Sequence, residues 1–529
     1  METPADTDEL FRPCVFASES NIIEESIIRV KSNENADSGY QISESSISTC
    51  PRKPRRRVKF YLETKYNVVR AAFASQEMWV GKNEIEASDI IWTDVCISVD
   101  RFARLGPHQR YNHFVGMNSL TRKNNLGRNL LRMKKFFRDD YSFFPDTWIL
   151  PMDMSDFKSQ PKKKAYIIKP DNSCQGRGIY ITKDLESVKV DYEQGFVAQM
   201  YISRPFLLDG YKFDLRIYVL VTGCDPLRVY VHSEGLVRLC CTPWNPSNTF
   251  TDMTMHLTNY AINVKSTSFR ENQDPSDIHD GHKRSMKLFF EYLQKIGHDS
   301  ESVLSQIDDL IIKTLLSVQP SVAHVNFSCQ PDDLENEQSF EILGFDVMLD
   351  ADLKPWLLEV NHAPSFATES KLDEQVKMAV LKDTFNLLAM KKKNLSPKIP
   401  SRKRFEETVL LAKFRDETET NLGGFRKIYP LREKEYAKFQ DKAMEIWETL
   451  TGAKNRPVIR LVESVPTVQH IVVEPVIKVG DKKKCMKIII PRKVQPKVFY
   501  KKVPKFLPIS SPSLTWWNMG SRLRSQSLI

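Results

Sequence analysis

The sequence predicts a mixed α/β (α+β) fold, because short runs of β-branched and aromatic residues are interspersed with segments of helical periodicity. With 529 residues the chain is long enough for two or three domains, and a hydrophobic content of 41% supports packed cores. The predicted strands are 165–169, 178–182, 196–200, 213–222 and 227–232, followed by a hairpin at 342–361, and the predicted helices between them are 287–295 and 303–319.

The first part of the chain, residues 1–57, is rich in Ser, Glu and Asn and is predicted to be a disordered leader. It ends in the basic run 52–57, which suits a localisation signal or a phosphate-binding patch and equally a solvated linker. A small N-terminal α/β domain is expected at 58–150, with a strand-like run at 58–62. Its basic amphipathic helix at 120–137 carries charges that either solvate an outer face or contact an acidic partner.

After residue 390 the chain becomes basic. A helix is predicted at 435–450 from an apolar stripe, and the stretch 482–505 holds ten basic residues and no acid. The segment 391–529 is therefore expected to be a basic, partly helical extension.

Lys and Arg exceed Asp and Glu, 77 against 67, which points to an acidic partner. The nine cysteines are scattered without a C-x-x-C motif, as expected of a protein from a reducing compartment. The acidic N-terminus is unlike a signal peptide, and no apolar run reaches the ~20 residues that cross a bilayer. The composition favours a soluble intracellular protein with no membrane partner.

The hairpin at 342–361 carries the most informative pattern. If the turn is centred on 350–353, paired residues have numbers that sum to about 705, so Asp346 faces Glu359 and Asn361 projects from the same face. Two facing carboxylates repel each other unless a cation lies between them, and oxygen ligands of this kind suit Mg²⁺. Gly344, opposite Asn361, is expected to leave room for a ligand. The alternative is that these acids are simply solvated.

A second pattern places glycines after a buried strand. Tyr166–Pro170 ends in a lysine and a proline, and Gln175–Gly178 follows as a glycine-containing turn before the next strand. Such a turn lets backbone N–H groups approach phosphate oxygens, with Lys169 supplying charge. It is not a P-loop, because a strand follows where a helix is required. A tight turn without a ligand is the other interpretation.

A third pattern is the row Lys212, Asp214 and Arg216, which share one face of a strand. The row suits a polyphosphate or, alternatively, a cross-strand ladder of ion pairs. The segment 256–263 offers Thr and Asn side chains that could bind a nucleotide or cap a turn.

Together these features follow the ATP-grasp plan, and the segments that carry them resemble the signature blocks of the tubulin–tyrosine ligase-like family, especially its polyglutamylase branch. These blocks are 166–181, 196–218, 235–238, 256–263 and 342–366. The resemblance extends over about 58–390, and the string 353–361 is its most specific part. It implies an ATP-grasp-type core with a central flap domain at 151–212 and a C-terminal domain with a magnesium site at 213–390.

The resemblance also implies roles for individual residues. The expected ATP contacts are Lys169, Gln175, Gly176, Arg177, Gly178, Gln199, Met200, Tyr201, Ile202, Lys212, Phe213, Asp214, Thr258 and Asn259. The expected Mg²⁺ ligands are Asp346, Glu359 and Asn361; the expected catalytic set is Arg216, Lys212 and Glu359; and the expected contacts of free L-glutamate are Arg238, Tyr260 and Lys283. One departure is Val264, where many members have lysine; either Lys265 substitutes or amino-acid recognition is altered.

The implied activity is ATP-dependent addition of L-glutamate to glutamate side chains of tubulin tails, through an acyl phosphate. The expected partners are tubulin or microtubules, which the basic extension 391–529 is expected to bind. A nucleic-acid-binding protein is disfavoured, because no recognisable binding motif is present and the basic segments lie outside the core. The expected form is a monomer on the cytoskeleton, with the cilium or basal body as a further location. A glycylase, an elongation-only enzyme and an inactive microtubule-binding scaffold are the alternatives. A kinase is disfavoured because H-R-D and D-F-G motifs are not present where the glycine motif requires them.

Overall fold

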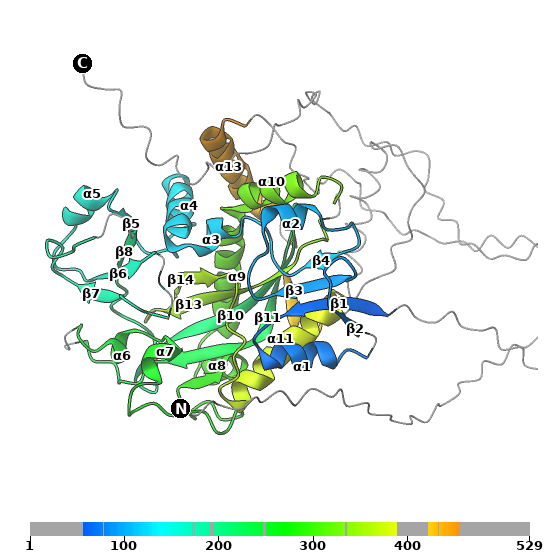
Figure 1. Ribbon diagram of the computed structural model, residues 1–529. Helices are drawn as coiled ribbons and strands as arrows, with labels where there is room; N and C mark the ends of the chain where they lie inside the picture. The colour runs from blue at the N-terminus through cyan, green and yellow to red at the C-terminus, as the bar shows by residue number, and fades with distance from the viewer. Residues whose placement is uncertain are drawn as a thin grey trace, which may run out of the picture. The chain divides into compact units, whose positions relative to one another are not determined.

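The computed structural model describes residues 57–453 except 78, 172, 174, 191–194, 247–249, 334–335, 389–421 and 432. The predicted leader and the basic stretch 482–505 lie outside the described residues. Within these residues the chain forms a mixed α/β fold with three sheets (Figure 1), which confirms the predicted fold class at this level. Among the helices of this part, none has the length and apolar character needed to cross a membrane.

The N-terminal sheet is parallel, with the strand order β2-β1-β3-β4. Its strands are β1 (Val58–Glu63), β2 (Trp79–Lys82), β3 (Ile90–Thr93) and β4 (Arg110–Tyr111), and the helices between them are α1 (Asn67–Ala74) and α2 (Val99–Ala103). Phe73 of α1 and Trp92 of β3 pack around Phe385 from a much later helix, so this sheet shares its core with the C-terminal part.

The predicted helix at 120–137 is two helices, α3 (Asn118–Thr121) and α4 (Lys123–Phe136). They are separated by Arg122, which is extended at φ −77° and ψ 131°. α4 buries Leu126, Leu130 and Met133, as the apolar stripe predicts. The break places Lys123 at the first position of α4.

The flap sheet has the order β5-β8-β6-β7 and is antiparallel. It consists of β5 (Thr147–Leu150), β6 (Tyr166–Pro170), β7 (Tyr180–Thr182) and β8 (Phe196–Met200), with α5 (Met154–Lys158) beside it. Trp148, Phe157 and Tyr166 form its aromatic core. The glycine turn thus joins two antiparallel strands, β6 and β7, as predicted.

The large sheet has seven strands, with a central order of β12-β11-β10-β13-β14. The strands are β9 (Leu207–Leu208), β10 (Tyr211–Cys224), β11 (Leu227–Leu239), β12 (Lys283–Ser285), β13 (Glu341–Leu349), β14 (Pro355–Asn361) and β15 (Phe425–Tyr429). Alternate residues of β10 enter two separate cores: Leu215, Ile217 and Val219 lie in one, and Tyr218 and Leu220 in the other.

Helices cover both faces of the large sheet (Figure 1). The first core receives α8 (Met286–Lys295), α9 (Ser300–Leu316) and α10 (Gln319–Cys329), whereas the second receives α11 (Lys371–Leu387) and α1. Two short helices, α6 (Met253–His256) and α7 (Tyr260–Asn263), lie in the connection between β11 and β12.

The expected basic extension contributes to this core. β15 pairs with β11, and α13 (Glu433–Thr451) buries Tyr436, Phe439 and Ala443 in the first core. The predicted helix at 435–450 is therefore confirmed, and residues 425–451 belong structurally with the sheet. Any truncation that starts before β15 removes part of the folded core.

Candidate active site

The β13–β14 hairpin has the predicted register at its open end. Asp346 is opposite Glu359, and Gly344 is opposite Asn361. The register then shifts by one residue between Asp346 and Val347, where β14 carries a bulge. The two carboxylates consequently face each other across the strand pair, and the amide of Asn361 lies on the same face.

Asp346 is held by two arginines from neighbouring strands. Arg216 of β10 is directly opposite Asp346 and donates from Nε to Oδ1 at 2.6 Å and from a terminal nitrogen to Oδ2 at 3.1 Å. Arg238 of β11 lies 2.8 Å from the same carboxylate. Although burial opposes ionisation, the charges of the two arginines lower the pKa of Asp346. Asp346 is therefore a carboxylate at neutral pH.

Glu359 is in the opposite situation. Burial raises its pKa, and the neighbouring charge of Asp346 raises it further. Asn361 Nδ2 donates to Glu359 Oε1 at 3.2 Å and is 3.5 Å from Asp346 Oδ2. Glu359 is thus the group of this pair that gains most from a bound cation.

The expectation that Gly344 leaves room for a ligand is wrong. A Cβ at this position would lie 3.1 Å from Pro364 Cβ and 3.3 Å from the Cδ and Nε atoms of Arg216. The small residue instead lets Arg216 cross the strand and reach Asp346.

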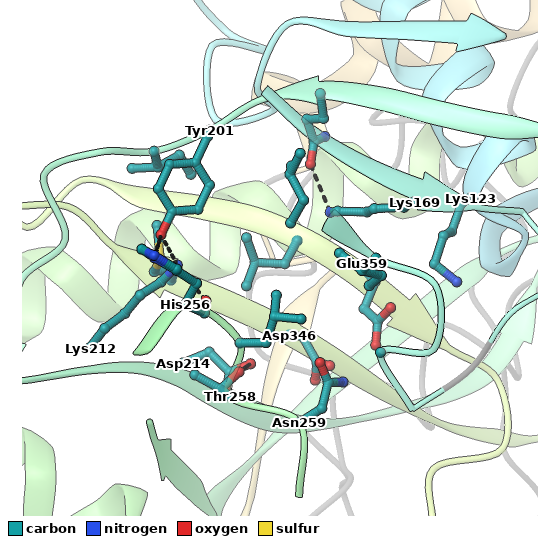
Figure 2. Close-up of a pocket in the computed structure, with 18 of the residues that line it drawn as sticks. Lys123, Lys169, Tyr201, Lys212, Asp214, His256, Thr258, Asn259, Asp346 and Glu359 are labelled. Carbon is teal, nitrogen blue, oxygen red and sulfur yellow. Dashed lines mark hydrogen bonds between the residues drawn. The ribbon is translucent and has the colours of Figure 1, made fainter. Parts of the chain in front are cut away.

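Two lysines bring positive charge to the same space. Lys169, next to the last residue of β6, donates to Gln199 Oε1 at 2.9 Å, and burial lowers its pKa to about 8. Lys123, at the start of α4, donates to Ser173 O at 2.7 Å. Figure 2 shows Lys123 and Glu359 at one end of the cavity, with Lys169 above it.

The glycine turn closes against the segment 256–263. Gly176 has φ +76°, and a Cβ there would lie 2.4 Å from Ile262 Cδ1 and 3.0 Å from Asn259 Oδ1. Only glycine fits this close approach without displacement. The turn and the loop that carries Thr258 and Asn259 therefore form one wall.

The other end of the cavity is aromatic. Lys212 Nζ donates to Tyr201 Oη at 3.0 Å and to His256 O at 2.9 Å, and Tyr201 Oη lies 2.9 Å from His256 Nδ1. Figure 2 shows these three residues together, away from Glu359. The charge of Lys212 is thus directed to Tyr201, in the segment 199–202 that leads from the flap sheet toward the large sheet and is called the hinge.

Asp214 connects the row on β10 to the rest of the site. Arg238 donates to both of its oxygens, at 2.8 and 2.6 Å, and Thr258 Oγ1 donates to Oδ2 at 2.7 Å. Arg238 therefore bridges Asp214 and Asp346. Two residues of the predicted binding row, Asp214 and Arg216, therefore belong to a ladder of ion pairs, whereas Lys212 bonds Tyr201 and His256 instead.

The cavity between the flap sheet and the large sheet has an empty volume of about 960 Å³, including space open to solvent. Many predicted site residues line it: Lys169, Gln175, Gly176, Gln199, Met200, Tyr201, Ile202, Lys212, Phe213, Asp214, Thr258, Asn259, Asp346, Glu359 and Asn361. Arg177, Gly178, Arg216, Arg238, Tyr260 and Lys283 are not in this lining.

The three residues predicted to bind the amino acid lie beside one another. Arg238 is paired with Lys283 across β11 and β12, and Lys283 Nζ lies 4.0 Å from the ring centre of Tyr260. Lys283 also forms ion pairs with Glu369 and Asp373, at 2.5 and 2.7 Å. Its charge is therefore already balanced, as is that of Arg238, which pairs with Asp214 and Asp346.

The cavity lining also contains Lys123, Ser173 and His256, which were not predicted from the sequence. Lys123 was hidden inside a predicted helix that is in fact broken at Arg122. His256 lies in the segment 256–263, whose sequence suits a nucleotide site and a capped turn equally. No local pattern marks Ser173, because its contribution is a backbone oxygen.

The residues fit a nucleotide and Mg²⁺. The facing carboxylates and the adjoining amide provide oxygen ligands of the kind that Mg²⁺ prefers, and a bound cation would lower the raised pKa of Glu359.

A second group of potential ligands, His113, Glu341 and His362, has its ligand atoms within 4.8 Å of one another. There the two ring nitrogens of His113 already have protein partners, Glu341 Oε1 at 3.2 Å and Thr93 O at 2.8 Å, which accounts for the contact without a metal.

Comparison with known families identifies the chain. The model of the tubulin-tyrosine ligase family matches residues 102–397. The chain belongs to this family. The match includes the flap sheet, the row on β10 and the acidic hairpin.

Several curated family members are similar to the chain. One is a probable beta-tubulin polyglutamylase of Tetrahymena thermophila, 41% identical over 74% of this chain and 36% of the relative. Another is the mouse tubulin polyglutamylase TTLL6, 41% identical over 77% of this chain and 51% of the relative. Mouse TTLL13, also named a tubulin polyglutamylase, is 37% identical over 86% of this chain and 59% of the relative. The chain thus spans roughly a third to three-fifths of the length of these relatives.

Proposed function

We propose that this chain is an ATP-dependent carboxylate–amine ligase that adds L-glutamate to glutamate side chains of acidic tubulin tails. The observation that carries the proposal is the pairing of Asp346 with Glu359 in a cavity that also holds Lys169. Membership of the tubulin-tyrosine ligase family, and relatives named as tubulin polyglutamylases, support the choice of reaction.

The proposed chemistry starts from the fact that a carboxylate is a poor acyl donor, since oxide would have to leave. Bound Mg²⁺-ATP supplies the phosphoryl group that makes the carboxylate of the tail reactive toward the amine of free glutamate. Asp346, Glu359 and Asn361 would hold Mg²⁺, and the glycine turn and the hinge 199–202 would hold the nucleotide. Little protein acid–base chemistry is then required.

The cationic residues would act on the developing charge. Lys169 and Lys123 flank the end of the cavity that contains Glu359, where they would stabilise charge on phosphoryl oxygens. Arg216 would face the same group, because its side chain reaches Asp346. Arg238 would hold the carboxylate of the incoming glutamate, with Tyr260 and Lys283 beside it.

The deciding experiment offers microtubules, ATP and, in separate reactions, labelled glutamate, glycine or tyrosine to the purified chain. We expect incorporation of glutamate only, and its loss in Glu359→Gln. Glu374→Gln, which changes an exposed acid on α11, is the matched control and should retain activity. Absence of incorporation of any of the three amino acids by the unsubstituted chain would exclude the ligase and leave a microtubule-binding scaffold.

A glycylase is the second candidate, and one observation favours it. Val264, where many family members have lysine, is 41% exposed at the end of α7, close to the proposed amino-acid pocket. If a lysine there contributes to recognition of a glutamate side chain, its replacement by Val264 favours a smaller donor. Incorporation of glycine instead of glutamate would support this alternative, and Val264→Lys should then shift the preference toward glutamate.

Attachment to microtubules is the third part of the proposal. The surplus of Lys and Arg, 77 against 67 acids, favours attraction to an acidic polymer that weakens with salt. Because β15 and α13 pack in the core, the truncation to test is removal of 454–529 rather than 391–529. We expect weaker co-sedimentation with microtubules after this truncation and unchanged thermal stability. In cells, the proposed enzyme would act as a monomer on the cytoskeleton, including cilia or basal bodies.

A further inference from the structure

Thr147 of β5 is neither a predicted site residue nor part of the cavity lining, yet two side-chain hydrogen bonds connect it to Lys169. Lys169 Nζ donates to Gln199 Oε1 at 2.9 Å, and Gln199 Nε2 donates to Thr147 Oγ1 at 2.9 Å. The register of the flap sheet creates this chain of bonds, because Gln199 of β8 is opposite both Thr147 of β5 and Ile167 of β6. Lys169 is two residues beyond Ile167 and projects from the same face.

The direction of these hydrogen bonds is set at Thr147. Its hydroxyl donates to Pro145 O at 2.8 Å, so only lone pairs remain for Gln199. If the side-chain oxygen of Gln199 faced Thr147 Oγ1, two acceptors would repel each other. The side-chain nitrogen can instead donate to the hydroxyl oxygen. The oxygen of Gln199 is consequently directed at the ammonium group of Lys169. Thr147 and Gln199 are 5% and 3% exposed, so bulk water cannot replace this arrangement.

We propose that Thr147 is a positioning residue that acts through Gln199 to keep the ammonium group of Lys169 charged and directed into the cavity. The binding of a nucleotide in this cavity rests on the proposed function. The hydrogen bonds from Thr147 to Lys169 are observed independently of it. An oxygen acceptor stabilises the ammonium form and so opposes the burial that lowers the pKa of Lys169 to about 8.

Other charges around Lys169 come from four elements. Glu359 of β14 and Asp346 of β13 favour its charged form, whereas Lys123 of α4 and Lys212 of β10 disfavour it. None of these four is changed by a substitution at Thr147. A shift in the titration of Lys169 in a Thr147 variant therefore reports on Gln199.

The test measures the pH dependence of acetylation of Lys169 by mass spectrometry, on the full chain without nucleotide. Thr147→Val keeps the shape of the side chain but removes its hydroxyl, and we expect a lower midpoint than in the unsubstituted chain. Thr147→Ser keeps both hydrogen bonds and should restore the midpoint. Gln199→Glu places a carboxylate against the ammonium and should raise it.

The matched control is Thr384→Val. Thr384 is buried in α11, and its hydroxyl donates to Val380 O. We expect this variant to lose thermal stability to a similar degree and to leave the Lys169 midpoint unchanged. A merely structural role for Thr147 predicts the same result for Thr147→Val, and that result would overturn the proposal.

A second measurement separates this proposal from the proposed function. For Thr147→Val we expect the dissociation constant of Mg²⁺-ATP to rise about tenfold at pH near 8, as for loss of one hydrogen bond to a charged group. If the unsubstituted chain binds no ATP but the acetylation midpoint still shifts, the ligase proposal fails and the positioning role stands. If ATP binds and the midpoint does not shift, the positioning role fails alone.

Discussion

Two buried acids on the same strand, Glu341 and Asp346, differ in what surrounds them. Glu341, at the start of β13, accepts from His113 at Oε1 and from the backbone N–H of Phe114 at Oε2. Asp346, five residues later, faces the carboxylate of Glu359. Glu341 is satisfied by its neighbours, whereas Asp346, although it is paired with Arg216 and Arg238, also faces a second carboxylate.

The difference teaches that burial of an acid does not identify a functional site. Glu341 is 0% exposed and Asp346 is 2% exposed, so exposure does not separate them. What separates them is the neighbour: a base that can share a proton in one case, and an acid with a raised pKa in the other. The charge of Asp346 is balanced by Arg216 and Arg238, so the remaining repulsion falls on Glu359, where a bound cation would relieve it.

The largest expected effect is on catalysis. Glu359→Gln should reduce the proposed ligase activity by about a thousandfold, because it removes a carboxylate that we propose holds Mg²⁺. Stability should not fall, since the substitution also removes the repulsion from Asp346. Initial rates of labelled glutamate incorporation and thermal unfolding of the same preparations test both statements. A loss of stability as large as that of a core deletion would place Glu359 with Glu341 and break the comparison.

The next effect is on stability alone. Glu341→Ala should destabilise the chain by about 3 kcal/mol, because it leaves His113 and the N–H of Phe114 buried without their partner. Urea unfolding measures the change, and Asp146→Asn, in a partly exposed ion pair with Lys134, is the control, with an expected effect below about 1 kcal/mol. The folded fraction should keep its activity per molecule; its loss would show that Glu341 belongs to the active site.

The sequence predicted the elements whose partners are near in the chain. The β13–β14 register was predictable because a turn of a few residues joins the paired strands. The contact between Arg216 and Asp346 was not, since β10 and β13 are brought together over 130 residues. The same limit hid Thr147, whose partner Gln199 is 52 residues away on another strand.

Local irregularities explain the other differences. The sequence predicted a strand at 227–232, and the polar residues Ser233 and Glu234 and then Gly235 follow it. The strand continues to Leu239, with irregular pairing to β10 beside these residues, and so carries Arg238 into the site. Likewise, apolar periodicity predicted the packing of α4 but not its break at Arg122, which depends on backbone angles that the pattern does not encode.

A smaller effect is expected at Gly344, where the absence of a side chain allows Arg216 and Pro364 to lie close to the backbone. Gly344→Ala should reduce activity about tenfold, because its Cβ must push aside Arg216 or Pro364 by a few tenths of an ångström. The dissociation constant of the nucleotide should change less than the rate, since Arg216 is outside the cavity lining. Gly81→Ala, whose Cβ would lie 3.5 Å from Phe60, is the control. Unchanged kinetics would remove Arg216 from the proposed catalytic set.

The smallest expected effect is on the pH dependence of stability. Although burial opposes it, Glu341 raises the pKa of His113 above its usual 6.5, so His113 contributes stability that is present below that value. The contribution is lost as pH rises through the raised pKa, by at most about 1.4 kcal/mol per pH unit.

Glu341→Gln should remove this dependence while keeping the fold, because an amide can donate to neutral His113 and accept from the N–H of Phe114. The measurement is the urea midpoint from about pH 6 to about pH 9, in the variant and in the unsubstituted chain. A flat profile in the variant, with a falling profile in the parent, marks Glu341 as a proton-sharing structural acid. Equal slopes in both would mean that Glu341 does not set the charge of His113. The contrast between Glu341 and Asp346 would then need another cause.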